Sequence, residues 1–444
     1  MKVCVVGLWH LGMVTAACLA SAGHEVVGLD FDFENVQKLQ GGQPPIFEPG
    51  LEELIRQGLS MGHLSFSEDI GKAVHGAEVV WVAFDTPVDD EDRANVEFVV
   101  GRVTRLFPWL EMNALVLISS QLPVGTTRRL EKIYAETYPD RPVTFGYSPE
   151  NLRLGKAIHA FTQPDRVVVG IRTNTDRDRV KELLQPFTDR IEWMSIESAE
   201  MTKHVLNAFL ATSIVFINEV ATLCEEVGAD AKEVERGLKS DVRIGLRAYL
   251  SPGAAFAGGT LARDIIFLKQ IGVAHKQPTF LLSAVDQSNV AHKQWAYRKL
   301  QSLLGELRGQ QIAVWGLTYK PGTDTLRRSA SLELCEWLVQ QGASVNAHDP
   351  AVKTLPRELA KRFKVHATAL AALEGASALV VATEWPEYQS LSSEAVLAAM
   401  RVFLVLDPNR FLATTLGSDP RIKYVTVGKP DKLITIADGL IADS

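Results

Sequence analysis

The first residues that could do chemistry form a short turn near the N-terminus, GLWHLG at residues 7–12. The turn follows an apolar run and precedes a helix-like run, which is the setting of the phosphate-binding turn G-x-G-x-x-G. Gly7 would allow the tight turn, and Gly12 would allow the helix to pack closely on the strand. Asp30 closes the next apolar run, where its carboxylate would accept the ribose hydroxyls and repel a 2′-phosphate. The pattern predicts an NAD site.

Trp9 stands where the middle glycine of this turn is expected, and a side chain there points towards the cofactor's pyrophosphate. Three interpretations are open. The loop shifts and the indole lies beside the adenosine half, the indole fills the phosphate site and excludes the cofactor, or the ring turns away and packs on the surface. We expect NAD binding to be retained.

Apolar runs and amphipathic stretches alternate over the first ~190 residues, as in a βαβ series. KVCVVGL, HEVVGLD, AEVVWVAF, LVLISS and RVVVG have the composition of buried parallel strands. From about 195 to 300 the pattern is helical, and a second βαβ series then begins at QIAVWGL. We predict an α/β fold with two Rossmann-like doubly wound domains, at 1–195 and 301–444, joined by a helical central region at 196–300 that contains a long helix.

The two βαβ series resemble each other in sequence. GLWHLG after the first strand corresponds to GLTYKPG after the strand at 311–315, and GAEVVWVAFDTP (76–87) corresponds to GASALVVATEWP (375–386). Ligands of such sheets bind beyond the carboxyl ends of the strands. We therefore expect the active site in a cleft between the two domains, next to the central helix.

Composition narrows the class of partner. The net charge of −7 gives no electrostatic footprint for nucleic acid or for an anionic membrane. The first strand begins at about Met1, which leaves no room for a signal peptide. The run 205–224 is long enough to span a membrane, but Asn207, Asn218 and Glu219 favour a buried helix between domains.

The four cysteines are widely scattered and lack the spacing of metal ligands. Each lies in an apolar pattern, which is typical of reduced core thiols in a cytoplasmic protein. The sequence predicts no metal site. The cysteines are Cys4, Cys18, Cys224 and Cys335.

Several longer segments resemble the UDP-glucose/GDP-mannose dehydrogenase family over nearly the whole chain. They are PPIFEPGLEEL (45–55), LPVGTT (122–127), SPENLRLGKA (148–157), PDRVVVG (164–170), EMTKHVLNAFLAT (200–212), DVRIGLRAYLSPG (241–253), GLTYKPGTDTLRRSASLEL (316–334) and ATEWPEY (382–388). The resemblance implies NAD in the N-terminal domain and a nucleotide sugar (a UDP- or GDP-sugar) between the central helix and the C-terminal domain. It also implies oxidation of the sugar's C6 hydroxyl to a carboxylate in two hydride transfers, by a homodimer built around the central helix.

The resemblance also implies roles for individual residues. The residues expected in catalysis are Lys203, Asn207, Asp264, Glu150 and Thr260. Those expected at the cofactor are Gly7, Trp9, His10, Leu11, Gly12, Asp30, Thr86, Glu150, Arg263 and Arg327. Those expected at the substrate are Lys203, Asn207, Arg243, Tyr249, Leu250 and Lys320.

Some positions depart from the family's pattern. FAGGTLARDI places Thr260 where the family has the cysteine whose thiolate adds to the C6 aldehyde, and Arg263 where it has a lysine. Gln121 and Leu154 replace a threonine and an acid of the same chemistry. An arginine can still contact a pyrophosphate, but a threonine hydroxyl is a poor nucleophile beside a thiolate.

Three functions remain open at this point. The favoured one is a nucleotide-sugar dehydrogenase-like oxidoreductase of the UDP-glucose 6-dehydrogenase type, which transfers hydride from the sugar's C6 to NAD, with the full four-electron oxidation disfavoured because Thr260 replaces the cysteine. The second is a non-catalytic nucleotide-sugar-binding or regulatory homologue, and the third is a different reaction on the same scaffold with Lys203 and Asp264 as acid and base.

Overall fold

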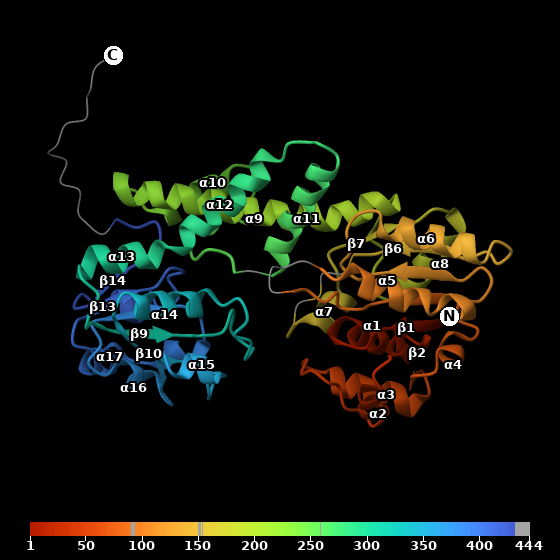
Figure 1. Ribbon diagram of the computed structural model, residues 1–444, viewed down its shortest axis with the longest axis horizontal. Coiled ribbons are helices and arrows are strands. Elements are labelled where there is room, and N and C mark those ends of the chain that lie inside the picture. Colours follow the sequence, from red (N-terminus) through yellow and green to blue (C-terminus); the bar gives the residue numbers. More distant parts are fainter. Residues whose placement is uncertain (90–93, 150–151, 153, 258, 431–444) are drawn as a thin grey trace, which may run out of the picture. The chain divides into compact units, whose positions relative to one another are not determined.

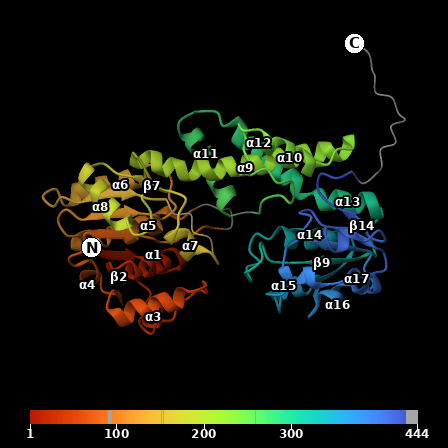
Figure 2. The same cartoon turned by 180° about the vertical axis from the view of Figure 1, so that it is seen from behind.

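The computed structural model describes residues 1–444 except 90–93, 150–151, 153, 258 and 431–444. The chain divides into two compact units, Met1–Val205 and Leu206–Ser444. Figure 1 labels their helices and strands, and Figure 2 shows them from behind. The boundaries expected from the sequence, at 195 and 300, stay predictions.

The first unit is built on an eight-stranded sheet in the order β3-β2-β1-β4-β5-β6-β7-β8. Its strands are β1 (Lys2–Val6), β2 (Glu25–Leu29), β3 (Leu64–Ser67), β4 (Val79–Val82), β5 (Leu115–Ile118), β6 (Thr144–Tyr147), β7 (Val167–Gly170) and β8 (Ile191–Met194). The chain leaves β1 towards β2 on one side and later returns to β4 on the other. This reversal beside β1 is the point where doubly wound sheets bind their ligands.

Helices cover both faces of this sheet. They are α1 (His10–Ser21), α2 (Phe33–Gln40), α3 (Leu51–Met61), α4 (Ile70–Val74), α5 (Val96–Thr104), α6 (Thr126–Thr137), α7 (Ala157–Thr162) and α8 (Asn174–Leu184), with a 3₁₀ turn at Phe107–Trp109. Alternate residues of β1 point to opposite faces: Val3 and Val5 pack in the core under α1, α3, α7 and α8, whereas Cys4 and Val6 pack under α4, α5 and α6. Burial on both faces explains why the strands are continuous apolar runs.

Strand β7 corrects one expectation. RVVVG was expected to be parallel to its neighbours, but β7 is antiparallel to β6, with Tyr147 opposite Gly170, and parallel to β8. An apolar run that is buried on both faces has the same composition in either direction, so the pattern could not fix the direction of the strand.

The second unit contains a six-stranded parallel sheet in the order β11-β10-β9-β12-β13-β14. Its strands are β9 (Gln311–Trp315), β10 (Ser344–His348), β11 (Lys364–Val365), β12 (Ala378–Val381), β13 (Leu404–Leu406) and β14 (Lys423–Val425). The order repeats that of the first six strands of the other sheet, which fits the sequence echo. The predicted fold class, α/β with two Rossmann-like sheets and a helical central region that contains a long helix, is confirmed.

The remaining helices belong to the region after the first sheet. They are α9 (Ile196–Val227), α10 (Ala231–Ser240), α11 (Thr260–Ala274), α12 (Phe280–Lys293), α13 (Trp295–Leu304), α14 (Ala330–Gln340), α15 (Arg357–Ala360), α16 (Ala369–Leu373) and α17 (Ser393–Ala399), with 3₁₀ turns at Pro386–Ser390 and Leu416–Ser418.

Helix α9 is the long helix that the sequence predicts, and its 32 residues contribute to both units. It is long and apolar enough to cross a membrane by length and composition alone, and 44% of its apolar window is buried. The helix is less buried than expected, because Phe209, Phe216 and Leu223, spaced by seven residues, are half or more exposed.

Candidate cofactor and substrate site

The turn between β1 and α1 has the geometry that its glycines predict. Gly7 has φ of +91°, in the region that favours glycine, and its N–H donates to the Leu29 carbonyl at 2.9 Å. A Cβ on Gly12 would lie 1.8 Å from the Gly7 carbonyl oxygen. Helix α1 begins at His10, and its N-cap side chain makes no capping hydrogen bond. The first N–H groups of α1 therefore point out of the turn, as in anion sites at helix N-termini.

Trp9 occupies the N-cap of α1 with φ of −88° and ψ of −154°, a conformation that any residue adopts. The turn therefore does not require glycine at this position for its backbone. Half of the Trp9 side chain is exposed (49%), so the indole is not packed into the protein interior.

Asp30 lies at the end of β2 and is fastened to the same turn. Its Oδ2 accepts the Leu8 N–H at 2.6 Å, and its Oδ1 accepts the Asp32 N–H at 3.1 Å. Asn35 donates from Nδ2 to the Leu8 carbonyl at 3.1 Å. The carboxylate remains partly exposed beside the turn, which fits a group that binds ribose hydroxyls.

A cluster of aromatic rings and guanidinium groups begins at Phe31, directly after Asp30. The Arg102 guanidinium lies 3.6 Å from the centroid of the Phe98 ring, and Arg105 lies 4.1 Å from that of Phe31. Phe31 stacks on Phe84, which follows β4. Partial burial lowers the pKa of Arg102, while the Asp30 carboxylate opposes that shift. Sequence reasoning missed this cluster, although aromatic residues directly after β2 and near the end of β4 were a usable signal.

Glu48 is a second missed residue, within the segment PPIFEPGLEEL. Its side chain is buried, and its carboxylate contacts His10 Nε2 at 3.0 Å while accepting the N–H groups of Gly155 (2.7 Å) and Ala157 (2.9 Å). His10 was expected at the cofactor, and the structure shows it held by Glu48 at the start of α1. No local sequence signal distinguishes Glu48 from a surface glutamate.

Thr86 and Leu11, also expected at the cofactor, lie in the first unit. The Thr86 hydroxyl donates to the Gln121 carbonyl at 2.7 Å, which ties the segment after β4 to the segment after β5. Leu11 lies half-buried in the first turn of α1. Glu150 lies outside the described residues.

Helix α9 carries Lys203 and Asn207 one turn apart. Lys203 is half-buried in the first unit, between two fully buried residues that are one turn apart, Glu200 and His204. In the second unit, the Asn207 amide donates from Nδ2 to Asp264 Oδ2 of α11, and both side chains are buried. The structure therefore brings together two of the predicted catalytic residues that are far apart in sequence.

Thr260 is the first residue of α11, after Gly259 with φ of +106°, and it is exposed. Arg263 and Asp264 follow in the first turn of the same helix, where Arg263 is half-buried. Burial raises the pKa of the Cys4 and Cys335 thiols, so neither is poised as a nucleophile. Among the residues that the structure describes, no three His, Cys, Asp or Glu side chains gather as a metal site.

The expected substrate residues of the second unit lie in loops. Arg243 is paired with Asp241 of its own loop at 2.7 Å, and Tyr249 is half exposed. Leu250 closes this loop with an N–H donated to the Ala248 carbonyl at 2.9 Å. These contacts leave the loop accessible to a ligand.

The connection from β9 to α14 holds the other expected residues, Lys320 and Arg327. The Lys320 ammonium lies 5.4 Å from the centroid of the Tyr319 ring, and the Arg327 side chain is exposed. The connection starts at Gly316, with φ of +91°, in a second copy of the glycine turn. Asp349 after β10 accepts the Leu317 N–H there at 2.7 Å.

Two sheets of Rossmann type, of which the first carries a glycine turn beside an accessible carboxylate, are typical of NAD-dependent dehydrogenases. Three family models match the chain: the UDP-glucose/GDP-mannose dehydrogenase family NAD binding domain at 1–188, the central domain at 197–291 and the UDP binding domain at 313–414. The chain belongs to the UDP-glucose/GDP-mannose dehydrogenase family. The predicted resemblance and the cofactor, NAD, are confirmed.

Individual relatives agree with this assignment. The chain is 34% identical to UDP-glucose 6-dehydrogenase of Pseudomonas aeruginosa over 97% of its length and 98% of the relative. It is also 34% identical to UDP-glucose 6-dehydrogenase of Rhizobium meliloti over 97% of its length and all of the relative. The structure of a UDP-glucose dehydrogenase from Pyrobaculum islandicum matches with a TM-score of 0.84 at 30% identity, covering 96% of this chain and 98% of that one.

Proposed function

We propose that this chain oxidises a nucleotide sugar at C6 by one hydride transfer to NAD and stops at the aldehyde. The observation that carries the proposal is Thr260 at the start of α11, one turn before the buried Asp264 that binds Asn207. The equipment for the first oxidation is retained, whereas the nucleophile of the second is replaced.

The first step needs an oriented water to take up the proton of the C6 hydroxyl and needs the developing oxygen charge to be stabilised. Lys203 and Asn207, one turn apart on α9, supply a cation and an amide for that oxygen. Asp264 accepts from the Asn207 amide and so fixes its orientation. NAD, when bound, accepts the hydride, and the β1–α1 turn with Asp30 would hold its pyrophosphate and ribose.

The second step needs a nucleophile that adds to the aldehyde and leaves again after the second hydride is lost. A thiolate does both, because its pKa is low and the thioester is readily hydrolysed. The Thr260 hydroxyl is far less acidic, and an ester is hydrolysed less readily. The proposal therefore assigns the aldehyde as the product.

The test compares the wild type with Thr260→Cys and, as a matched control, Thr260→Ser. Each protein is incubated with NAD and UDP-glucose, a UDP-N-acetyl sugar or GDP-mannose, while NADH and product mass are recorded. We expect one NADH per aldehyde from the wild type and from the serine variant, and two NADH per acid from the cysteine variant. Acid formation by the wild type, with two NADH per sugar, would contradict the proposal.

A non-catalytic role in binding a nucleotide sugar is the second candidate. Thr260, Gln121 and Leu154 together favour it, since all three departures fall on the same chemistry. It predicts saturable binding of a nucleotide sugar by calorimetry with no NADH from any of the sugars tested.

The relatives' names point to UDP-glucose as the first sugar to try, and Arg243, Tyr249, Leu250 and Lys320 are the residues proposed to receive it. Loss of calorimetric binding in Lys320→Ala would support this assignment. Unchanged binding would remove Lys320 from the site.

We propose a cytoplasmic homodimer that pairs through α9. The exposed apolar side chains Phe209, Phe216 and Leu223 recur every seven residues, a spacing that suits helix pairing. Phe216→Asp should convert a dimer into a monomer in analytical ultracentrifugation, whereas Phe33→Asp, at another half-exposed phenylalanine, should not. A dimeric Phe216→Asp protein would contradict pairing through this stripe. The cytoplasmic location is supported by the four cysteines, which are all buried thiols, as is typical of proteins in a reducing compartment.

A further inference from the structure

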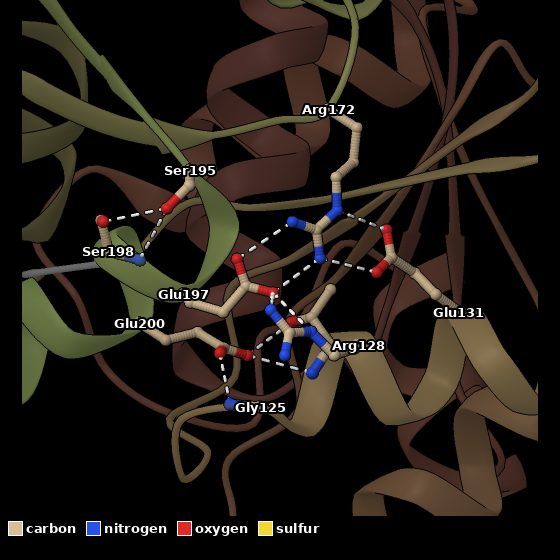
Figure 3. Close-up of polar contacts among 9 residues, drawn as sticks. Gly125, Arg128, Glu131, Arg172, Ser195, Glu197, Ser198 and Glu200 are labelled. Atoms are coloured by element: carbon tan, nitrogen blue, oxygen red, sulfur yellow. Dashed lines mark hydrogen bonds and ion pairs between the residues drawn. The ribbon is translucent and has the colours of Figure 1, made fainter.

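The segment 121–127, which leads from β5 into the first turn of α6, is bonded at both ends to the second and third turns of α9. His204 Nε2 contacts the Leu122 carbonyl at 3.0 Å. Glu200 Oε2 accepts the Gly125 N–H at 2.6 Å, and Glu200 Oε1 accepts the N–H (3.0 Å) and hydroxyl (2.7 Å) of Thr127. Figure 3 shows the Glu200 carboxylate directed at Gly125.

Glu200 belongs to α9, but its carboxylate caps the N-terminus of a different helix, α6. Helix α6 starts after Gly125, which has no side chain to cap it, and a carboxylate is the group that suits the N–H groups and positive end of a helix. Glu200 and His204 are both fully buried, so water does not replace these bonds. Burial raises the pKa of Glu200, whereas the bonds from Gly125 and Thr127 oppose the shift.

The same segment is also tied to the cofactor side of the sheet, because the Gln121 carbonyl accepts the Thr86 hydroxyl at 2.7 Å. A chain of bonds thus runs from the segment after β4, through residues 121–127, to the α9 turn that carries Lys203. Lys203 lies between Glu200 and His204 in sequence. The contacts of these two residues therefore fix the position of the helical turn that carries Lys203, both along the helix axis and in rotation about it.

We propose that Glu200 and His204 are positioning residues that set Lys203 against the cofactor edge of the sheet. This inference rests on the proposed function for the role of Lys203, but the anchoring itself does not. Glu200 and His204 touch neither substrate nor cofactor in this proposal, and they act through Lys203.

A second set of contacts between α6 and α9 provides the matched control. Arg172 joins Glu131 of α6 (2.8 Å) to Glu197 of α9 (2.7 Å), as Figure 3 shows, and Glu197 also pairs with Arg128 at 2.8 Å. The side chains of this network are partly exposed, and its ion pairs are formed by Arg128, Glu131, Arg172 and Glu197. Glu131→Gln weakens the contact of α6 with α9 without removing either anchor of the segment.

The decisive variant is Glu200→Gln, which keeps the volume but presents an NH₂ group to N–H donors. We expect hydrogen exchange at the Gly125 and Thr127 amides to rise on the order of 10-fold, since a bond to a charged group is lost. Acetylation of Lys203 by acetic anhydride, relative to the exposed Lys132, should rise as its turn loosens. The control, Glu131→Gln, should change neither the hydrogen exchange nor the acetylation of Lys203. If Glu200→Gln does not fold, Thr127→Val takes its place and should raise both quantities by a smaller amount.

Turnover supplies the functional readout. In an active wild type, Glu200→Gln should lower kcat on the order of 10²-fold, as misplacement of a reacting group does, with the Kd for NADH changed less than threefold. Equal Lys203 labelling in Glu200→Gln and wild type, or equal kcat in Glu200→Gln and Glu131→Gln, would overturn the proposal. A wild type without turnover defeats the proposed function, and the Lys203 labelling then decides the anchoring by itself.

Discussion

In both sheets a glycine with φ of +91° directly follows the first strand, Gly7 after β1 and Gly316 after β9. Each glycine N–H donates to the carbonyl of the last residue in the neighbouring strand, at 2.9 and 2.8 Å. The next N–H donates to an aspartate that follows that strand, to Asp30 at 2.6 Å and to Asp349 at 2.7 Å. The local construction is the same in the two units.

The two turns lead into different structures. Helix α1 begins at His10, directly after the first turn, whereas α14 begins only at Ala330, after a long connection. Asp30 remains partly exposed, but Asp349 is 2% exposed and also accepts the Trp385 indole N–H at 3.0 Å. The first unit therefore combines its glycine turn with a helix start and an accessible carboxylate, which are the features of a dinucleotide site, whereas the second unit lacks both features.

The largest loss of stability should come from the turn after β9, whose aspartate, Asp349, is buried. Asp349→Ala leaves the N–H groups of Leu317 and Thr318 and the Trp385 indole N–H buried without their acceptor, so we expect a loss of ~4 kcal/mol in unfolding free energy. Urea unfolding measures it. Asp30→Ala is the control, with an expected loss of ~1 kcal/mol in unfolding free energy. Equal losses in the two variants would show that the two aspartates do not differ in their structural role.

Asp30→Ala should instead act on the cofactor. Loss of a charged acceptor for the ribose hydroxyls should weaken NADH binding by ~2–3 kcal/mol, which is about 30- to 150-fold in Kd. Calorimetric titration with NADH and NADPH measures it, and the preference for NADH over NADPH should fall as well. Unchanged NADH affinity in Asp30→Ala would show that the Asp30 carboxylate does not accept the ribose hydroxyls.

Gly12→Ala tests the close approach of helix and turn, which the second unit lacks. The new Cβ would lie 1.8 Å from the Gly7 carbonyl oxygen, and the shift it forces should cost ~2 kcal/mol in unfolding free energy. Gly101 of α5, where an added Cβ meets nothing within 4 Å, is the matched control, and Gly101→Ala should gain up to ~1 kcal/mol. A stabilised Gly12→Ala protein would mean that the turn relaxes freely.

Trp9→Gly should have the smallest effect. Trp9 has an ordinary backbone conformation and a half-exposed ring. We therefore expect the free energy of NADH binding to change by less than ~1.4 kcal/mol, which is a factor of 10 in Kd. Tryptophan fluorescence quenching in the wild type and in Trp9→Phe identifies the signal from this ring. A gain above 10-fold in Trp9→Gly would show that the indole obstructs the phosphate site.

Local patterns predicted the fold well because each rule acts within a few residues. The glycines of the first turn, Asp30 and the repeated segment after β4 all have local signatures, and the structure places them as expected. The direction of β7 was not predictable, since burial on both faces removes any sign of direction. The exposed stripe on α9 was missed because its apolar residues resemble those of a core helix.

The site was predictable only in part. Asn207 and Asp264 were identified through family resemblance, and no spacing rule joins residues 57 apart. Glu48 and Glu200 were missed because each carboxylate caps backbone of a distant segment, and such a partner exists only after the sheet has formed.

The long connection from β9 to α14 has a consequence for how this protein can diversify. Most of its residues from Tyr319 to Arg327 are exposed, so substitutions there remove little buried surface. A saturation library confined to 319–327 should therefore yield mostly folded variants. Residues 7–12 should tolerate far fewer substitutions, because Gly7 has a positive φ and Gly12 packs against the Gly7 carbonyl oxygen.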